Sequence, residues 1–138
     1  MQVYYKLVSG GSYSLLFDES AGDANEEFAP TFRDAVDKHP GYGAASAWRS
    51  AMSNTECTIA FRWNSSYSTA ALAKDAHRSL RATFKGVPVH LKIISGTGTG
   101  STSYFPNAVM ESSGYKLRNI SVDHHFTFSA DDETTTAP

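Results

Sequence analysis

The residues of this sequence that could do chemistry are its five histidines, one cysteine and a glycine-rich segment. A zinc site needs three or four ligands that converge on one point. His124 and His125 are sequence neighbours, so on a strand they would face opposite sides of the sheet. His77 has no carboxylate at positions 73 or 81, and His39 and His90 stand alone. We therefore expect no metal site and no cofactor.

A hydrolytic or phosphate-binding site is the next possibility. Asp123, His124 and the many serines could form a triad, but the chain has no G-x-S-x-G motif around a nucleophile. Gly96-Thr97-Gly98-Thr99-Gly100 resembles a phosphate-binding loop, which should lead into a helix with a lysine nearby. Here the chain continues as Tyr104-Phe105-Pro106 into a predicted strand, so we interpret the segment as a hairpin loop. We expect that the protein is not an enzyme.

The composition limits the class of protein. A chain of 138 residues, 41% hydrophobic, suits one domain with one core. Its single cysteine, Cys57, excludes an intrachain disulfide, and its alternation with Ile59 predicts an inert buried thiol. The net charge of −2 argues against a nucleic-acid-binding domain, so any contact with DNA should be passive. We expect no signal peptide and no membrane partner, since no apolar run approaches the roughly 20 residues that span a bilayer.

Alternating apolar and polar residues predict antiparallel strands with one buried face. Such segments cover residues 2–8, 13–17, 57–63 and 87–94, and Pro88 indicates that the last of these starts there or lies at a sheet edge. The stretch 104–130 predicts two long strands. Its second half places Ile120, Val122, His124, Phe126 and Phe128 on one face, and Ser121, Asp123, His125, Thr127 and Ser129 on the other.

Helical patterns are fewer. Residues 69–85 predict a helix capped by Ser68 or Thr69, with an apolar stripe of Leu72, Ala76, Leu80 and Phe84. Residues 28–54 favour two short helices, at 31–38 and 44–52. The predicted fold is mainly β (α+β): an antiparallel β-sandwich or barrel of about six or more strands, with the helix packed at its side. We expect residues 1–130 to form a single β-sandwich domain and residues 131–138 a mobile tail.

The order of elements from Ala47-Trp48 onward carries a resemblance. A strand from Cys57 to Trp63 leads into the helix, then into Gly86-Val87-Pro88-Val89, then into Tyr104-Phe105-Pro106-Asn107-Ala108-Val109, and Ile120 to Ala130 closes the domain. This succession resembles the tail tube (major tail) proteins of long-tailed bacteriophages. The chain departs from that family near Pro106-Asn107, where a glycine is usual, which leaves a tail terminator or completion protein as an alternative.

The resemblance implies a structural subunit of the virion, made in the cytoplasm of a bacterial host. Copies of it would close into rings, expected to be hexameric, and the rings would stack into a tube through which DNA passes. Its partners would be itself and other tail proteins. A mildly acidic chain suits a lumen in which DNA must slide, and edge strands are suited to pairing between subunits.

Several exposed segments are candidates for those contacts. The acidic segment Asp18–Glu27 is either a solvated loop or a loop that docks on a basic patch of another subunit. The loop 95–103 and the tail 131–138 are further candidates. The residues that we expect at subunit interfaces are Asp18, Glu19, Asp23, Glu26, Glu27, Pro88, Thr97, Thr99, Asp123 and His125.

A second class of function is a monomeric β-sandwich binding module, for example for carbohydrate, which would expose a row of aromatic rings. Trp63 alternates in phase with Phe61 and Ile59, which predicts a core position rather than a binding platform. Tyr4, Tyr42 and Tyr67 remain as candidate exposed rings.

Overall fold

The structure is a computed structural model. It describes residues 1–19, 24–40, 47–98 and 100–138, and the side chains of these except 24–26, 34–40 and 47–55. Seven strands and one helix make up this part of the chain, so the mainly β prediction is confirmed. In chain order they are β1 (Gln2–Leu7), β2 (Ser14–Asp18), β3 (Ala24–Pro40), β4 (Ala47–Ser66), α1 (Ala70–Phe84), β5 (Val89–Ile94), β6 (Thr102–Arg118) and β7 (Ser121–Asp131).

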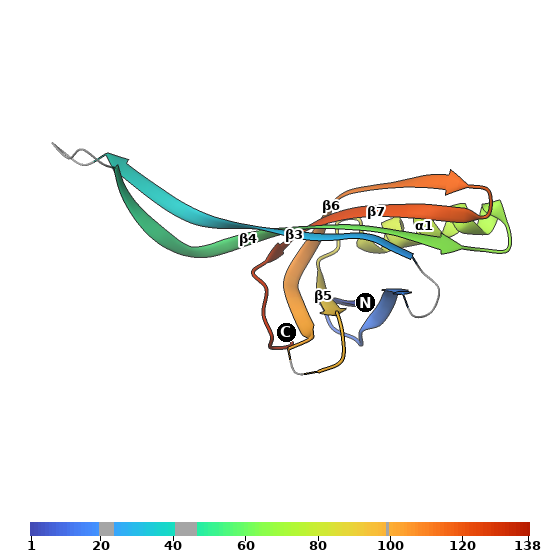
Figure 1. Ribbon diagram of the computed structural model, residues 1–138, viewed down its shortest axis with the longest axis horizontal. Coiled ribbons are helices and arrows are strands. Elements are labelled where there is room, and N and C mark those ends of the chain that lie inside the picture. Colours follow the sequence, from blue (N-terminus) through green and yellow to red (C-terminus); the bar gives the residue numbers. More distant parts are fainter. Residues whose placement is uncertain (20–23, 41–46, 99) are drawn as a thin grey trace.

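All strand pairs are antiparallel, and the strand order is β2-β1-β5-β6-β7-β4-β3. β6 joins the two halves of this sheet: residues 102–108 pair with β5, and residues 109–118 pair with β7. Figure 1 shows the β1, β2 and β5 half below the β7, β4 and β3 half. The sheet therefore curls into a sandwich-like shape whose two layers are connected through β6.

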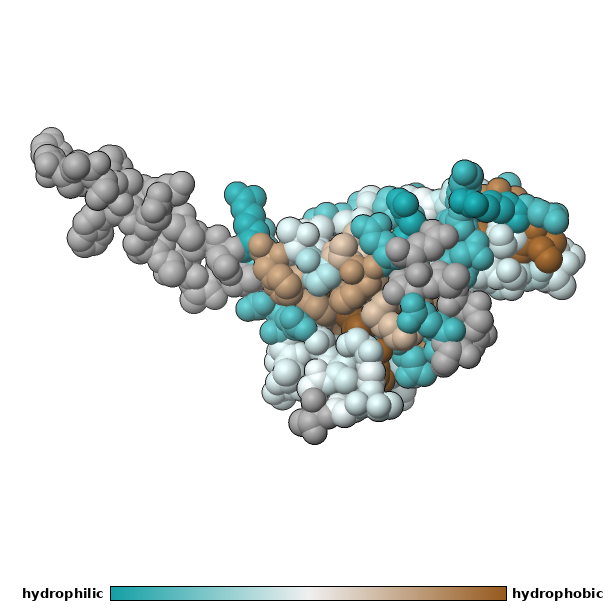
Figure 2. Space-filling model, in the orientation of Figure 1, coloured by the Kyte–Doolittle hydropathy of each residue, from teal (hydrophilic) through white to brown (hydrophobic). Residues whose placement is uncertain are grey.

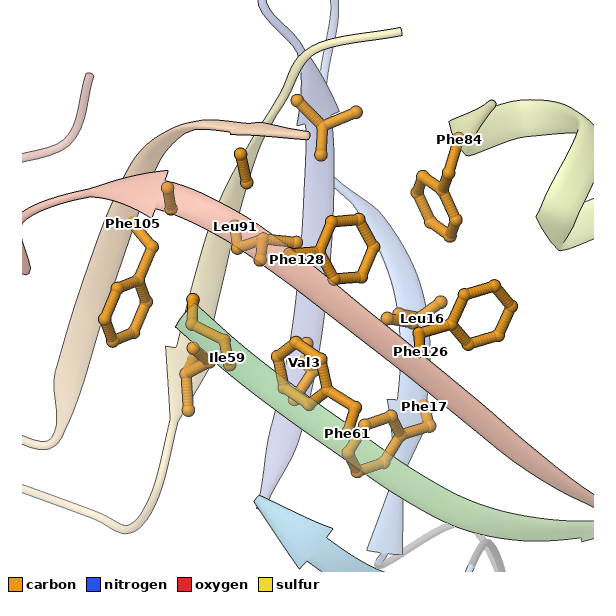
Figure 3. Close-up of a cluster of buried hydrophobic side chains, with 14 of the residues drawn as sticks. Val3, Leu16, Phe17, Ile59, Phe61, Phe84, Leu91, Phe105, Phe126 and Phe128 are labelled. Carbon is orange, nitrogen blue, oxygen red and sulfur yellow. The ribbon is translucent and has the colours of Figure 1, made fainter. Parts of the chain in front are cut away.

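The core lies between these layers and is rich in aromatic rings. In the described end of β4 every second residue is buried in the core, namely Cys57, Ile59, Phe61 and Trp63. The rings of Phe17 and Trp63 stack with centroids 4.8 Å apart, which links β2, at one end of the strand order, to β4, the strand next to the other end. In Figure 3 the labelled side chains from β1, β2, β4, α1, β5, β6 and β7 point toward one common cluster. Each buried Phe stabilises the fold by roughly 1.5–3 kcal/mol.

The predicted helix is confirmed as α1, but the face that it buries differs from the predicted apolar stripe. The Thr69 hydroxyl accepts a hydrogen bond from the Leu72 amide at 3.2 Å and so caps the N-terminus. The buried helix residues are Ala73, His77 and Phe84, with Leu80 partly buried. Leu72 is 50% exposed, so its predicted core position is wrong. The buried stripe runs through His77, a polar residue that the apolar pattern did not count.

The prediction of two helices in 28–54 is wrong for the described residues. β3 and β4 instead form a long antiparallel hairpin, with pairs from Ala24↔Asn64 to Pro40↔Ala47. Residues 41–46 lie outside the described residues. Alanine-rich composition favours a helix only weakly, and pairing between two long strands overrides that preference.

A β-bulge changes the phase of β6. Asn107 adopts a left-handed backbone (φ 52°), which Asn tolerates better than most residues. Strict alternation along 104–110 would predict one face for Phe105 and Val109 and the other for Ala108. That prediction is wrong, because Phe105 and Ala108 are both buried and Val109 is 41% exposed. The sequence has two turn-prone segments between the predicted strands, 112–114 and 118–119. β6 continues through the first, and the chain turns at the second, where Asn119 has a φ of 54°.

The predicted strand at 87–94 begins at Val89, directly after Pro88, and lies between β1 and β6. Of the two alternatives for Pro88, the start of the strand is therefore right and the sheet edge is wrong.

The C-terminal residues lie against the body of the protein. Tyr104 and Thr134 exchange two backbone hydrogen bonds of 2.8 and 2.9 Å, and Lys6 Nζ donates to the Pro138 carbonyl at 3.1 Å. The mobility of residues 131–138 stays a prediction.

Two phenylalanines on the paired strands β3 and β4 test this description of the core. Phe61 is fully buried and Phe32 is 43% exposed. Phe61→Ala should lower the free energy of unfolding by about 3–5 kcal/mol, because it leaves a cavity in the core. Phe32→Ala, the matched control, should lower it by no more than about 1 kcal/mol. Urea unfolding measures both, and equal losses would contradict the proposed packing.

Candidate functional site

The most prominent feature outside the core is an arm, defined as residues 34–40 of β3 and 47–55 of β4. β4 pairs with β7 only from Glu56 onward, so the arm strands pair with each other and leave the sheet. Figure 1 shows the arm projecting far from the rest of the protein. Seven residues of strand extend it by about 20 Å. An isolated two-stranded ribbon is at best marginally stable in water, so such an arm suits a contact with another chain.

The opposite end of the molecule carries exposed apolar side chains, which we call the apolar tip. Leu117 and Ile120, at the turn between β6 and β7, are 40% and 42% exposed. Figure 2 shows hydrophobic residues at this end, away from the arm. Apolar surface at one end and a protruding arm at the other suit head-to-tail contacts between copies.

A groove of about 460 Å³ lies on the outer face of β4, β7 and β6. Its cations are Arg62, Lys116 and Arg118, and His125 also lines it. Gly114 stands opposite His125 on the neighbouring strand, and its missing side chain leaves the hollow open. These cations make the groove a surface that suits anionic groups.

Asp123 lines this groove and holds neighbouring side chains in place. Its carboxylate accepts hydrogen bonds from Asn64 Nδ2 at 2.6 Å and from Arg118 Nε at 2.7 Å. Burial alone would raise the pKa of Asp123, but the Asn64 hydrogen bond and the Arg118 charge hold that pKa below its usual value. Asp123 therefore stays ionised and ties the end of β6 to β4 across β7.

A buried histidine pair lies beneath β7. The Nδ1 atoms of His77 on α1 and His124 on β7 are 3.0 Å apart. Burial, with the nearby charge of Arg81, lowers the pKa of His77. Burial and His77 lower the pKa of His124 to about 4, against an opposing effect of Asp123. A hydrogen bond between the two Nδ1 atoms needs one donor and one acceptor, and the lowered pKa values of both histidines favour neutral rings at pH 7.

The pair is part of the aromatic core rather than a reactive centre. His124 stacks on Trp63 with centroids 4.7 Å apart, and its Nε2 has no hydrogen-bond partner among the described residues. Within the described part of the chain, no group of three or more His, Cys, Asp or Glu could hold a metal. Burial raises the pKa of Cys57 to about 11, so its thiol stays protonated.

The residues predicted at subunit interfaces occupy different environments. Asp18 is buried and accepts a hydrogen bond from Gln2 Nε2 at 2.8 Å. Glu19 pairs with the Met1 amino group, and Glu27 is exposed, 4.0 Å from Arg62. Asp123 and His125 are brought together in the groove.

The remaining predicted interface residues are scattered. Pro88 and Thr97 are exposed, on either side of β5. Asp23 and Thr99 lie outside the described residues, as does the side chain of Glu26. A contact role for these ten residues stays a prediction.

Sequence reasoning missed the groove and the arm. The groove had no local signal, because its cations Arg62, Lys116 and Arg118 come from different strands. The arm had no such signal either, because its alanines favour a helix rather than a strand. Trp63, as predicted, is buried rather than part of an exposed platform.

No protein-family model matches the chain, and no curated protein matches it. Among solved structures, the chain matches one described as "Tail of empty GTA particle computed with helical refinement, C6 symmetry", with a TM-score of 0.58. The match covers 99% of this chain and 95% of that chain at 12% identity. The two chains share one fold. The resemblance to tail proteins is thus confirmed at the level of the fold. None of the described helices has the length and apolar character needed to cross a bilayer.

The histidine pair predicts a pH-dependent stability. Both pKa values are lowered by folding, so the unfolded chain binds more protons below its ordinary His pKa of about 6.5. The contribution of the two neutral histidines to the free energy of unfolding should be fully present above about pH 6.5. It should decrease as the pH falls toward about 4. His124→Phe, which keeps a ring against Trp63, should lose less stability than wild type between these values.

Urea unfolding at several pH values measures this difference. His125→Phe, on the other face of the same strand, is the matched control and should retain the wild-type loss. An identical pH profile for wild type and His124→Phe would contradict the assignment.

Proposed function

We propose that this protein is the tail tube subunit of a phage-like particle. Six copies close into a ring. The rings stack into a hollow tube through which DNA passes as passive cargo. The observation that carries this proposal is the fold shared along nearly the whole chain with a chain from a C6-symmetric particle tail.

The geometry of the subunit supports the proposal. The arm projects from one end and the apolar tip lies at the other, so that stacked copies can bury both. Head-to-tail contacts between unlike surfaces generate closed rings or open stacks, depending on the rotation between copies. The net charge of −2 suits a tube that must not grip DNA.

The proposal includes a place and a set of partners. The subunit belongs to the virion tail, is made in the cytoplasm of the bacterial host, and contacts other tail proteins. It carries out no catalysis. A tail terminator is the related alternative, and it would form a single ring that does not stack.

An arm-deletion variant tests the role of the arm. Asp34 and Thr55 are paired across the hairpin, so residues 35–54 can be replaced by Asn-Gly, the turn preferred between two strands. This variant should fold, because the core lies outside the arm, and should not form tubes. Negative-stain microscopy and circular dichroism measure assembly and folding.

Wild type at the same concentration is the control and should form stacked rings. A wild type that remains monomeric at high concentration would contradict the proposed function. Single rings that do not stack would favour the terminator, and tubes from the arm-deletion variant would show that the arm is dispensable.

A further inference from the structure

The groove on the outer face of β4, β7 and β6 owes its hollow centre to one residue. Arg62, His125 and Gly114 stand opposite one another on these three neighbouring strands. Residues opposite one another share a face of the sheet, and Gly114 adds no side chain to that face. Two strand spacings separate Arg62 from Gly114 by about 10 Å. A ligand that lies over Gly114 is therefore within reach of the long Arg62 side chain.

Two further cations border this hollow along β6. Lys116 and Arg118 follow Gly114 at every second residue, so they lie on the same face, about 7 Å apart along the strand. Lys116 is exposed and takes part in none of the ion pairs that the described residues form. Acidic side chains at every second position of an extended peptide have the same spacing of about 7 Å. This row of charges therefore matches an extended acidic segment.

Arg118 is oriented by Asp123. Its Nε donates to Asp123 Oδ2 at 2.7 Å, while Asn64 Nδ2 donates to Oδ1 of the same carboxylate at 2.6 Å. The contact uses Nε, so the two terminal nitrogens of the planar guanidinium can donate to a bound carboxylate. The Arg118 side chain is 60% exposed, which leaves it open to a partner. Asp123 thus positions one cation of the groove and accepts a hydrogen bond at each of its own oxygens.

Arg62 completes the set of cations. Its Nε lies 4.0 Å from the Glu27 carboxylate, and the two side chains are 49% and 43% exposed. Exposed ion pairs contribute little to stability, because water and salt screen them. A bound carboxylate can therefore take the place of Glu27 beside Arg62. The groove then offers three cations to one ligand, in a volume of about 460 Å³.

The charge and contacts of this chain indicate what kind of occupant fits. Asp18 and Glu19 bond to the first two residues, and Asp131 and Glu133 bond to side chains of β6, so these acids are already engaged within the chain. A nucleic-acid backbone carries a negative charge at every phosphate, which the net charge of −2 and the carboxylate of Asp123 in the groove disfavour. The observations favour an acidic segment of a different protein.

We infer that this groove binds an extended acidic peptide segment of a partner protein. The peptide lies along β6 over Gly114, and its carboxylates accept hydrogen bonds from Lys116, Arg118 and Arg62. Charge complementarity selects the partner, and the hollow over Gly114 admits its backbone. The inference goes beyond the proposed tube function, because it assigns a partner class to one surface of the subunit and does not require ring formation.

Filling the hollow tests this site. The probe is a fluorescein-labelled octapeptide of alternating glutamate and threonine, and fluorescence anisotropy at low salt measures its binding to the purified protein. Gly114→Val should raise the dissociation constant at least ten-fold, because the new side chain occupies the groove. The fold should tolerate valine, since a Cβ at this position meets His125 Nδ1 at 3.7 Å and the Gly114 backbone is not left-handed.

The matched control is Ser112→Val, which adds the same side chain two residues earlier on the same face. Ser112 is exposed, stands opposite Thr127 and does not line the groove. This variant should bind the peptide like wild type. A second peptide with glutamine in place of glutamate should not bind, and raised salt should weaken binding of the acidic peptide.

A charge reversal provides a second, independent variant. Lys116→Glu should also weaken binding at least ten-fold, because it removes a cation and adds a repelling carboxylate. Lys85→Glu, which changes the net charge equally at an exposed position after α1, should leave binding unchanged. Circular dichroism and urea unfolding check that each variant is folded, and Lys116→Glu decides the question if Gly114→Val does not fold.

The outcomes distinguish this inference from the proposed function. If wild type does not bind the acidic peptide, or if folded Gly114→Val and Lys116→Glu bind it as well as wild type, the inference is wrong. It is also wrong if the groove variants lose binding to a fluorescent DNA strand instead, or if they lose only self-association, since nucleic acid or a second copy then occupies the groove. Rings seen by negative-stain microscopy without peptide binding overturn this inference alone, and peptide binding by a strictly monomeric wild type overturns the tube function alone.

Discussion

The fold depends on one strand that pairs with both halves of the sheet. β6 changes its partner from β5 to β7 near Asn107. The β-bulge at this point adds one residue to β6 and bends the strand. Without that change of direction, the sheet would stay open and its apolar face would be solvated. With it, Phe17 reaches Trp63 from the other layer and the aromatic core closes. The same change leaves residues 109–118 without a second strand neighbour in the described part, so closure of the core and exposure of the edge have one cause.

Most strands and the helix could be predicted from the sequence because their periodicity is enforced by burial. Cys57, Ile59, Phe61 and Trp63 alternate because one side of β4 faces the core and the other does not. The phase of β6 could not be predicted, since a single residue in a left-handed conformation moves Ala108 inward and Val109 outward. Local composition does not report such a bulge.

The arm and the groove show two further limits of sequence reasoning. The arm strands lie outside the sheet, so no core imposes a period of two on their sequence, and helix propensity then misleads. The groove depends on long-range register, because Arg62, His125 and Gly114 become neighbours through the pairing of β4, β7 and β6. The candidate interface residues Asp123 and His125 could be placed on the outer face by alternation. The hydrogen bond that Asn64 donates to Asp123 could not be predicted from the sequence.

The two tryptophans give this protein a built-in optical readout. Trp48 is paired with His39 in the arm, whereas Trp63 is stacked between Phe17 and His124 in the core. Fluorescence of a chain that retains Trp48 alone will follow the surroundings of the arm, and that of a chain that retains Trp63 alone will follow core packing. Folding and engagement of the arm can therefore be timed separately without a label, each in its own single-tryptophan variant.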